Sequence, residues 1–407
     1  MTNILIIEPS SSGLKLISTA KSMNLGVVVF NANKDERIIP EQYKKNIDKL
    51  IEIDTYNIDA QYHATKKINN DFAISAIIPG SEYHVPIASI LSEKMNLPCV
   101  PSKYIDVLRI KSKTRDALKN KSIRNVRYVQ IQNEHEIISA SREIGFPCVI
   151  KPIASAGSIH VSRCNAFEEL LHAYQSLSQD QWTELGKEIG QAALIEEYID
   201  GEEFSVEGYI DNNDARIISI TKKFLSKEPF FIEMGHIVSA NLDEVKKNSI
   251  EAYIQNLIKT LKINLGIFHA EIKVDEQGPV LMEIAGRLPG CRIPDLIQLS
   301  KNINFYEVMI KSHLNWPIKI NYIETKQYAG MCYFHLNNKH IFHRINGVDQ
   351  LHTLPGFQEF TLLKNPGEFV PPLTDFQGRV AYCIFTASNY NQLQSMLNLA
   401  QLSVIFD

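Results

Sequence analysis

Two glutamates lie in apolar segments on either side of a turn signal, in the stretch FHAEIKVDEQGPVLMEIAGR at residues 268–287. The side chains around Glu271 and Glu283 predict two half-buried β-strands. A carboxylate in such a place is costly unless a cation or a hydrogen-bonding partner accompanies it. The pair therefore marks a candidate site, and a solvated strand face is the alternative that the pair alone leaves open.

The turn between the two strands decides whether the carboxylates share a face. With the three-residue loop EQG, Asp275 pairs with Pro279, and Glu271 lies directly opposite Glu283. Gly278 then takes a positive φ at the third loop position, whereas a two-residue loop predicts opposite faces. We expect the three-residue loop. Two adjacent carboxylates without His or Cys at ligand spacing favour Mg²⁺, which proteins usually share with substrate phosphates.

Lysines suited to phosphate occur upstream of this hairpin. Lys151 ends an apolar run in VIKPIASAGS, and the small residues that follow, up to Ser158, form a loop whose N–H groups can approach phosphate oxygens. The loop is not a P-loop, because GxxxxGK[ST] is absent from the sequence. Lys111 and Lys113 lie in IKSKTRDAL, a basic segment that alone would most often be a solvated helix face.

Composition bounds the class of protein. The 407 residues exceed one typical core and predict two or three domains. A hydrophobic fraction of 44% and a net charge of −4 are typical of a soluble protein, and not of one built to bind nucleic acid or an anionic membrane. No apolar stretch approaches the ~20 residues that span a bilayer. The first residues lack a signal-peptide pattern and the six cysteines form no CxxC pair, so we expect a cytoplasmic protein with reduced thiols.

Alternating strand-like and helix-like segments position these residues. Over the first hundred residues, NILIIE and GVVVFNA flank a helical pattern, which predicts βαβ units and a parallel sheet. The loops SSSG and PGSE follow two of its strands, at the edge where such sheets bind ligands. Both are candidate binding loops, although most loops of this kind have no role beyond reversing the chain. Further on, helical patterns near 166–188 and 242–264 alternate with strands and predict α+β lobes.

In this order, the motifs resemble the ATP-grasp superfamily over roughly residues 1–310. Within it, Lys111 with Arg115, VIKP, EEYIDGEEFSVE, FFIEMGH and HAEIK…EIAGR look like the L-amino-acid ligases. The resemblance implies an α/β and α+β fold, in which a Rossmann-like N-terminal domain precedes ATP-grasp lobes that sandwich ATP. The implied domains are a Rossmann-like domain at 1–105, a small lobe at 106–195, a large lobe with the Mg-ATP site at 196–310, and a C-terminal α+β part on the substrate side at 311–407.

The resemblance also implies a role for each matching residue. ATP would be bound by Lys111, Lys151 and Ser158 at the phosphates, by Glu196, Glu197 and Ile199 at the adenine, and by Glu203 at the ribose. Two Mg²⁺ ions, which Mn²⁺ can replace, would be bound by Glu271 and Glu283. Arg287 would contact the transferred phosphate and the acyl intermediate. Glu233 and His236 match positions that line the amino-acid pocket, and for His236 a general base, a substrate contact and a loop residue stay open.

The implied activity is that of a carboxylate–amine ligase, which makes a dipeptide through an acyl phosphate and releases ADP. Its partners would be small-molecule carboxylates and amines, with neither nucleic acid nor membrane, and many relatives are homodimers. Two alternatives remain: an ATP-grasp ligase for a non-amino-acid carboxylate, and a nucleotide-binding module without activity. Ala285 departs from the Asn common in the family. Cys291 and Arg292 also depart, and Arg292 either recognises a second carboxylate or faces solvent.

Overall fold

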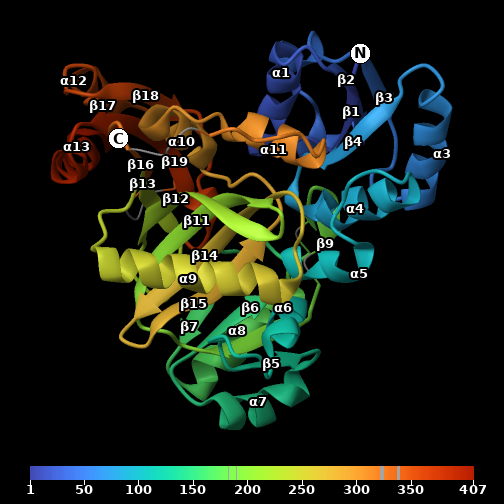
Figure 1. Ribbon diagram of the computed structural model, residues 1–407. Coiled ribbons are helices and arrows are strands. Elements are labelled where there is room, and N and C mark those ends of the chain that lie inside the picture. The colour runs from blue at the N-terminus through green and yellow to red at the C-terminus, as the bar shows by residue number, and fades with distance from the viewer. Residues whose placement is uncertain (182, 189, 321–324, 337–339) are drawn as a thin grey trace.

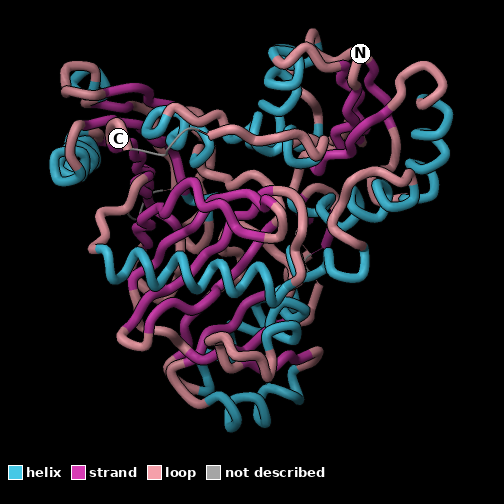
Figure 2. Tube along the Cα trace, viewed as in Figure 1, coloured by secondary structure: helices cyan, strands magenta, loops and turns pink. Residues whose placement is uncertain are grey.

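The computed structural model describes residues 1–407 except 182, 189, 321–324 and 337–339. Three larger sheets form the framework of this part of the chain, and helices lie around them (Figure 1, Figure 2). The first sheet is parallel and the other two are antiparallel, which confirms the predicted α/β and α+β class.

The N-terminal unit is a four-stranded parallel sheet in the order β3-β2-β1-β4. Its strands are β1 (Asn3–Ile7), β2 (Gly26–Asn31), β3 (Lys49–Glu52) and β4 (Ile74–Pro79). Its helices and 3-10 turns are η1 (Ser11–Gly13), α1 (Leu14–Ser22), η2 (Asp35–Arg37), α2 (Glu41–Lys44), α3 (Ile58–Ile68), η3 (Glu82–His84), α4 (Val85–Lys94), α5 (Ser102–Ile105) and η4 (Asp106–Leu108). β1 and β2 are buried along their whole length, as a parallel strand covered on both faces requires.

The loops SSSG and PGSE meet at the carboxyl edge of this sheet. A Cβ on Gly13 would lie 1.9 Å from the carbonyl oxygen of Gly80, so the two loops approach more closely than a side chain allows. This contact brings the ends of β1 and β4 together beside the second and third sheets.

The second unit is a four-stranded antiparallel sheet in the order β5-β10-β6-β7. Its strands are β5 (Tyr128–Ile131), β6 (Cys148–Pro152), β7 (Ser162–Cys164) and β10 (Ala193–Glu197). Its helices are η5 (Glu134–Glu136), α7 (Ile137–Ile144) and α8 (Phe167–Gln179), whereas α6 (Lys111–Leu118) precedes this unit in the chain and packs on the third sheet's side. Helices α7 and α8 pack their apolar faces on this sheet. The expected domain boundary at 195/196 falls inside β10, and we propose a boundary after Glu197 instead.

The helix predicted near 166–188 is wrong in its second half. It ends at Gln179, and a small hairpin follows, β8 (Thr183–Glu184) with β9 (Lys187–Glu188). Leu185 and Gly186 both have positive φ, of 49° and 78°, which is the conformation of a two-residue hairpin turn. The Tyr56 hydroxyl donates to the Leu185 carbonyl oxygen (2.9 Å), so the hairpin reaches the N-terminal unit.

The third sheet has eight strands in the order β15-β14-β11-β12-β13-β16-β19-β18. These strands are β11 (Glu202–Asp211), β12 (Asp214–Leu225), β13 (Glu233–Val238), β14 (Ile267–Asp275), β15 (Gly278–Ala285), β16 (Tyr328–His335), β18 (Phe357–Leu362) and β19 (Arg379–Ala387). The remaining elements are α9 (Glu244–Leu261), α10 (Ile293–Lys301), α11 (Phe305–His313), β17 (Ile345–Asn346), α12 (Val348–Leu351), η6 (Phe376–Gly378), α13 (Tyr390–Ser403) and β20 (Ile405–Phe406). Helix α9 confirms the long helix predicted near 242–264. Strands β16, β18 and β19 continue the sheet that carries Glu271 and Glu283, whereas β17 and β20 pair with each other in a separate two-stranded sheet.

One apolar core joins the N-terminal unit to the third sheet. Helices α10 and α11 lie between them (Figure 1), and their residue Met309 shares a buried cluster with Ile6 of β1 and Met331 of β16. The N-terminal loops are therefore held in place relative to the large sheet. Within the described ranges, no helix has both the length and the apolar character needed to cross a membrane.

Candidate active site

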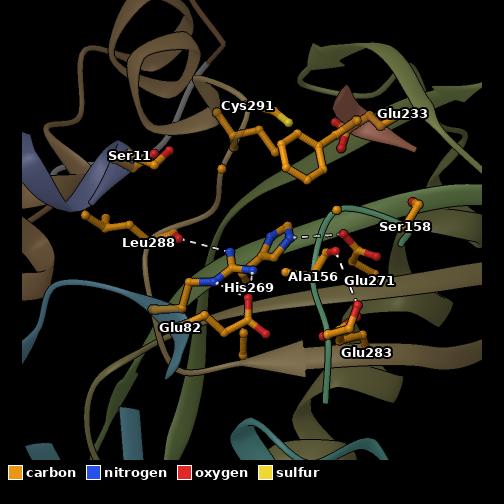
Figure 3. Close-up of a pocket in the computed structure, with 18 of the residues that line it drawn as sticks. Ser11, Glu82, Ala156, Ser158, Glu233, His269, Glu271, Glu283, Leu288 and Cys291 are labelled. Atoms are coloured by element: carbon orange, nitrogen blue, oxygen red, sulfur yellow. Dashed lines mark hydrogen bonds and ion pairs between the residues drawn. The ribbon is translucent and has the colours of Figure 1, made fainter. Parts of the chain in front are cut away.

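A cavity of about 770 Å³ lies where the three units meet. Its lining includes the loops SSSG and PGSE, the segment after β6, the β14–β15 hairpin and the start of β19. The predicted site residues that line it are Lys111, Lys151, Ser158, Glu196, Glu197, Ile199, Glu203, Glu233, Glu271, Glu283 and Arg287. His236 does not line it. Figure 3 shows Glu271 and Glu283 on one side of the cavity and Cys291 and Glu233 on the other.

Glu271 and Glu283 are direct partners across the β14–β15 ladder, as predicted. The predicted turn, however, is wrong: Asp275 pairs with Gly278, which leaves a two-residue loop. That loop alone would place the carboxylates on opposite faces. A β-bulge inserts Met282 as an extra residue in β15 and brings the two carboxylates back to one face. Gly278 does take a positive φ, of 95°.

The bulge also connects the hairpin to a buried network of charges. Arg115 Nη2 donates to the Met282 carbonyl oxygen (2.9 Å), and Lys151 Nζ lies 3.4 Å from the same oxygen. Both cations bind Glu196, with Arg115 Nε 2.8 Å from one carboxylate oxygen and Lys151 Nζ 2.6 Å from the other. All three side chains are buried. We name these three residues the Arg115–Glu196–Lys151 network.

Two cations share one carboxylate in this network. Burial would raise the pKa of Glu196, but Arg115 and Lys151 outweigh it and lower that pKa to about 2. Burial lowers the pKa of Lys151. Glu196 raises that pKa, but the positive charges of Arg115 and Lys111 lower it, and the net shift is downward. The network therefore has an excess of positive charge that a phosphate oxygen would balance.

Each carboxylate of the hairpin pair is held by a lysine. Lys111 Nζ lies 2.9 Å from a Glu283 oxygen, and Lys223 Nζ lies 2.6 Å from a Glu271 oxygen. Burial opposes ionisation of Glu271, but Lys223 and then His269 hold the pKa of that carboxyl well below its usual range. Glu271 is thus ionised, as metal binding requires.

Sequence reasoning missed Lys223, which joins three carboxylates of the site. Besides Glu271, its Nζ lies 3.4 Å from Glu203 and 3.6 Å from Glu233. Burial lowers the pKa of Lys223, but Glu233, Glu271 and Glu203 outweigh it and raise that pKa well above its usual range. Alternation along ITKKF predicts that one of its two lysines points inward and the other outward. It does not show that Lys223 lies near Glu271, because that depends on the sheet order, in which β12 is two strands from β14.

The carboxylate pair suits Mg²⁺ together with a phosphate. Among the described residues, no group of three or more His, Cys, Asp and Glu side chains is placed to hold a metal ion. Mg²⁺ takes six oxygen ligands and completes its shell with water and phosphate oxygens. Glu271 and Glu283 supply hard oxygens of this kind, and Lys111 and Lys223 can transfer their contacts to an arriving phosphate. The site therefore fits Mg²⁺ bound with a nucleotide.

Several predicted nucleotide residues use their side chains within the protein. The Ser158 hydroxyl donates to the Phe231 carbonyl oxygen (2.7 Å), which ties the loop after β6 to the third sheet's side of the cavity. The Glu197 carboxylate accepts from the backbone N–H and the Nε of Arg127, both at 2.8 Å. Its side chain is thus not left for a ligand, and its own backbone N–H donates to the Arg127 carbonyl oxygen (3.0 Å). Glu203 is half-buried, and this burial raises the pKa of its carboxyl despite Lys223.

Arg287 is fixed by a residue from the N-terminal unit. Its Nε donates to Glu82 (3.0 Å), and its Nη2 reaches the same oxygen. Arg109 Nη1 donates to the other oxygen of Glu82 (3.1 Å). Burial would raise the pKa of Glu82, but Arg287 and then Arg109 lower it to about 2. The PGSE loop was a candidate binding loop in the sequence, but its partner Arg287 is 205 residues away and could not be inferred.

His236 lies behind Glu233 rather than in the cavity. Its side chain is fully buried on β13, and its Nδ1 lies 2.6 Å from a Glu233 oxygen. Burial would raise the pKa of Glu233, but Lys223, His236 and more weakly Arg379 outweigh it and lower that pKa. A direct substrate contact is therefore open to Glu233 and not to His236. We propose that His236 is a positioning residue.

Arg292 has carboxylate partners of its own. It pairs with Asp295, and its Nη1 lies 2.7 Å from Glu359. It also donates to the Tyr382 hydroxyl. The sequence left open that Arg292 recognises a second substrate carboxylate. The structure does not favour this alternative, because Asp295 and Glu359 already neutralise its guanidinium.

Acid should destabilise the protein through Glu82 and Glu196. Both carboxyls have pKa values lowered from 4.5 to about 2 in the folded chain, so they stabilise it above pH 4.5. This stabilisation is lost as the pH falls toward 2, with a slope of up to ~1.4 kcal/mol per pH unit for each group. Urea unfolding between pH 6 and pH 3 measures the slope. A double Glu82→Gln, Glu196→Gln variant should give a flatter profile, and an equal slope would contradict the assignment.

Two regions of the chain match models of known families. Residues 144–295 match the ATP-grasp domain, and residues 334–406 match the L-amino acid ligase C-terminal domain 2. The chain is 22% identical over 98% of its length to the uncharacterized protein y4rH of Sinorhizobium fredii and covers 82% of that protein. It is 26% identical over 56% of its length to dapdiamide A synthase of Enterobacter agglomerans and covers 54% of that enzyme.

The fold is shared with a solved ligase. The crystal structure of an L-amino acid ligase from Bacillus licheniformis matches 100% of this chain and 98% of its own, with a TM-score of 0.83 and 19% sequence identity. The likeness therefore spans the N-terminal sheet, both antiparallel sheets and the C-terminal elements together.

Proposed function

We propose that this chain, an ATP-grasp carboxylate–amine ligase, joins the carboxylate of one amino acid to the amine of another. The observation that carries the proposal is one continuous cavity with two chemically different ends. Glu271 and Glu283 with Lys111 lie at the phosphate end, Cys291 lies across the cavity from Glu283 (Figure 3), and Glu233 is joined to Glu271 through Lys223. The match to the L-amino acid ligase C-terminal domain 2 and the likeness to the Bacillus L-amino acid ligase support the same substrate class.

ATP would bind with its phosphates between the carboxylate pair and the lysines Lys111 and Lys151. Bound Mg²⁺ would neutralise phosphate charge and so favour attack on the γ-phosphorus. The adenine would meet backbone groups of residues 196–199, since the Glu197 carboxylate is held by Arg127. Glu203 would accept hydrogen bonds from the ribose hydroxyls. Each of these residues lines the cavity, Arg127 excepted.

The reaction would proceed in two displacements. A carboxylate oxygen of the first amino acid attacks the γ-phosphorus, and the bond to the β-phosphate oxygen breaks, which gives an acyl phosphate and ADP. The free amine of the second amino acid then attacks the carbonyl carbon, the carbon–oxygen bond to phosphate breaks, and the departing phosphate takes the amine proton. Arg287 would contact the acyl phosphate through the N–H groups of its guanidinium that Glu82 does not engage. Its contacts with Glu82 hold it ready for that role.

Glu233 would serve the first amino acid as a hydrogen-bond acceptor. Its lowered pKa keeps the carboxylate ionised, so it is a poor proton acceptor and a good partner for a substrate ammonium group. His236 would keep it in place from behind.

A reducing, cytoplasmic setting belongs to the proposal. All six cysteines are free thiols, as such a compartment favours. The homodimer expected from the resemblance stays a prediction.

The decisive test is substrate-dependent phosphate release. With ATP and Mg²⁺, all pairs of the twenty amino acids should be screened, and products identified by mass. We expect release that requires an amino acid and a product equal to two amino acids less one water. Phosphate release stimulated by bicarbonate and by no amino acid would refute the proposal.

A further inference from the structure

Arg379 is a cavity-lining cation that the proposed reaction does not use. It begins β19 and is 8% exposed, in the lining that also contains Glu233. Its Nη1 lies 3.5 Å from the Cys291 sulfur, and its Nε is buried without a hydrogen-bond partner. In the described part of the chain, no carboxylate forms an ion pair with this guanidinium.

The other arginines of the lining are neutralised. Arg287 pairs with Glu82, and Arg292 pairs with Asp295 and Glu359. Glu233 and Asp375 act on the charge of Arg379 only from beyond ion-pair distance. A buried guanidinium that no carboxylate contacts is costly, and it cannot lower the cost by losing its proton. Arg379 therefore has the property expected of a group that awaits an anion from outside the chain.

Its neighbours hold the guanidinium without neutralising it. The Tyr333 ring, on the adjacent strand β16, lies 4.1 Å from the Arg379 carbon Cζ and covers it by a cation–π contact. Burial raises the pKa of the Cys291 thiol, which keeps it uncharged. Both neighbours line the cavity, so a ligand there can reach the same guanidinium.

The position of Arg379 separates it from the phosphates of ATP. Its neighbour Cys291 lies on the Glu233 side of the cavity, across from Glu283 (Figure 3). Lys111 and Lys151 supply cations at the opposite, phosphate end. The missing anion is thus a group of the substrate at the amino-acid end.

We propose that Arg379 binds a substrate carboxylate that is not activated in the reaction. This rests on the proposed function, in which one carboxylate is phosphorylated and at least one other is retained. The retained group is either the α-carboxylate of the amine-donating amino acid or a side-chain carboxylate of the first amino acid. The planar fork of Arg379 can bind either one through two parallel hydrogen bonds.

Direct binding tests the inference without requiring turnover. Amino acids and their α-carboxamides are compared by calorimetry, in the presence of Mg²⁺ and a non-hydrolysable ATP analogue, and glutamate is compared with glutamine. The wild type should prefer the carboxylate form in one of the two comparisons, which identifies the source. Arg379→Gln should raise the Kd of that form about 10- to 100-fold and leave the uncharged form within about twofold.

Two further variants make the result specific. Arg379→Lys keeps the charge without the fork and should retain part of the preference, whereas Arg292→Gln, at an arginine that is already paired, should leave the preference unchanged. A wild type that ignores the carboxylate in both comparisons, or an equal preference in Arg379→Gln, would overturn the inference. Amide formation, scored separately by product mass, reports on the proposed function alone.

Discussion

Replacing Glu283 by alanine should lower the rate of ATP-dependent product formation at least ~10³-fold and leave the fold intact. Glu283 lies directly opposite Glu271, and the proposed Mg²⁺ would lose one of its two protein carboxylates. The Glu283 side chain is 24% exposed, and its buried partner Lys111 keeps a hydrogen bond to the Ser155 carbonyl oxygen (2.8 Å), so the fold should tolerate the loss of this pair. Initial rates of phosphate release at saturating ATP, measured across a range of Mg²⁺ concentrations, give the effect.

The control lies on the same hairpin. Glu276 stands at its exposed tip, and Glu276→Ala removes a carboxylate of the same type without touching the cavity. We expect that variant to keep turnover within about twofold and its thermal midpoint within ~2 °C of the wild type. Turnover of Glu283→Ala within tenfold of the wild type would remove the metal assignment from this pair.

Replacing Glu196 by alanine should destabilise the protein by ~3–5 kcal/mol. The substitution leaves Arg115 and Lys151 buried and facing each other without their shared carboxylate. Lys151 should then lose its proton in the folded chain, because its pKa is already lowered by burial. Affinity for ATP should fall for the same reason, since a neutral lysine no longer attracts phosphate.

The neighbouring glutamate provides a matched control for this effect. Glu197 follows Glu196 on β10, but its side chain points to the other face and pairs with Arg127, which is 62% exposed. Glu197→Ala should cost no more than ~1 kcal/mol. Thermal midpoints should differ by roughly 10 °C between the two variants. Similar midpoints would show that the buried network is not the main contributor.

The sequence allowed strand pairs and local chemistry to be predicted, because these depend on neighbours along the chain. The partnership of Glu271 with Glu283 was predicted from alternation on two strands joined by a short turn. Lys151 was selected because a loop of small residues follows its strand. Such inferences use only spacing, propensity and the cost of burying charge.

Contacts between distant segments could not be predicted in the same way. Glu82 meets Arg287 across 205 residues, and Lys223 reaches Glu271 only because β11 lies between their strands. The position of His236 behind Glu233 depends on which face of β13 the cavity occupies. The β-bulge at Met282 was missed because a bulge and a longer loop have the same effect on parity, and the sequence does not distinguish them.

That bulge sets how the hairpin tolerates changes in length. Residues added at the tip, between Asp275 and Gly278, leave both strands in register. Deleting Met282 would remove the bulge, and Glu283 would then follow Leu281 in a regular ladder and still pair with Glu271 on the same face. The same deletion would remove the Met282 carbonyl oxygen that accepts from Arg115. In this hairpin, the extra residue of β15 therefore serves the buried network, and its loss is compatible with an intact carboxylate pair.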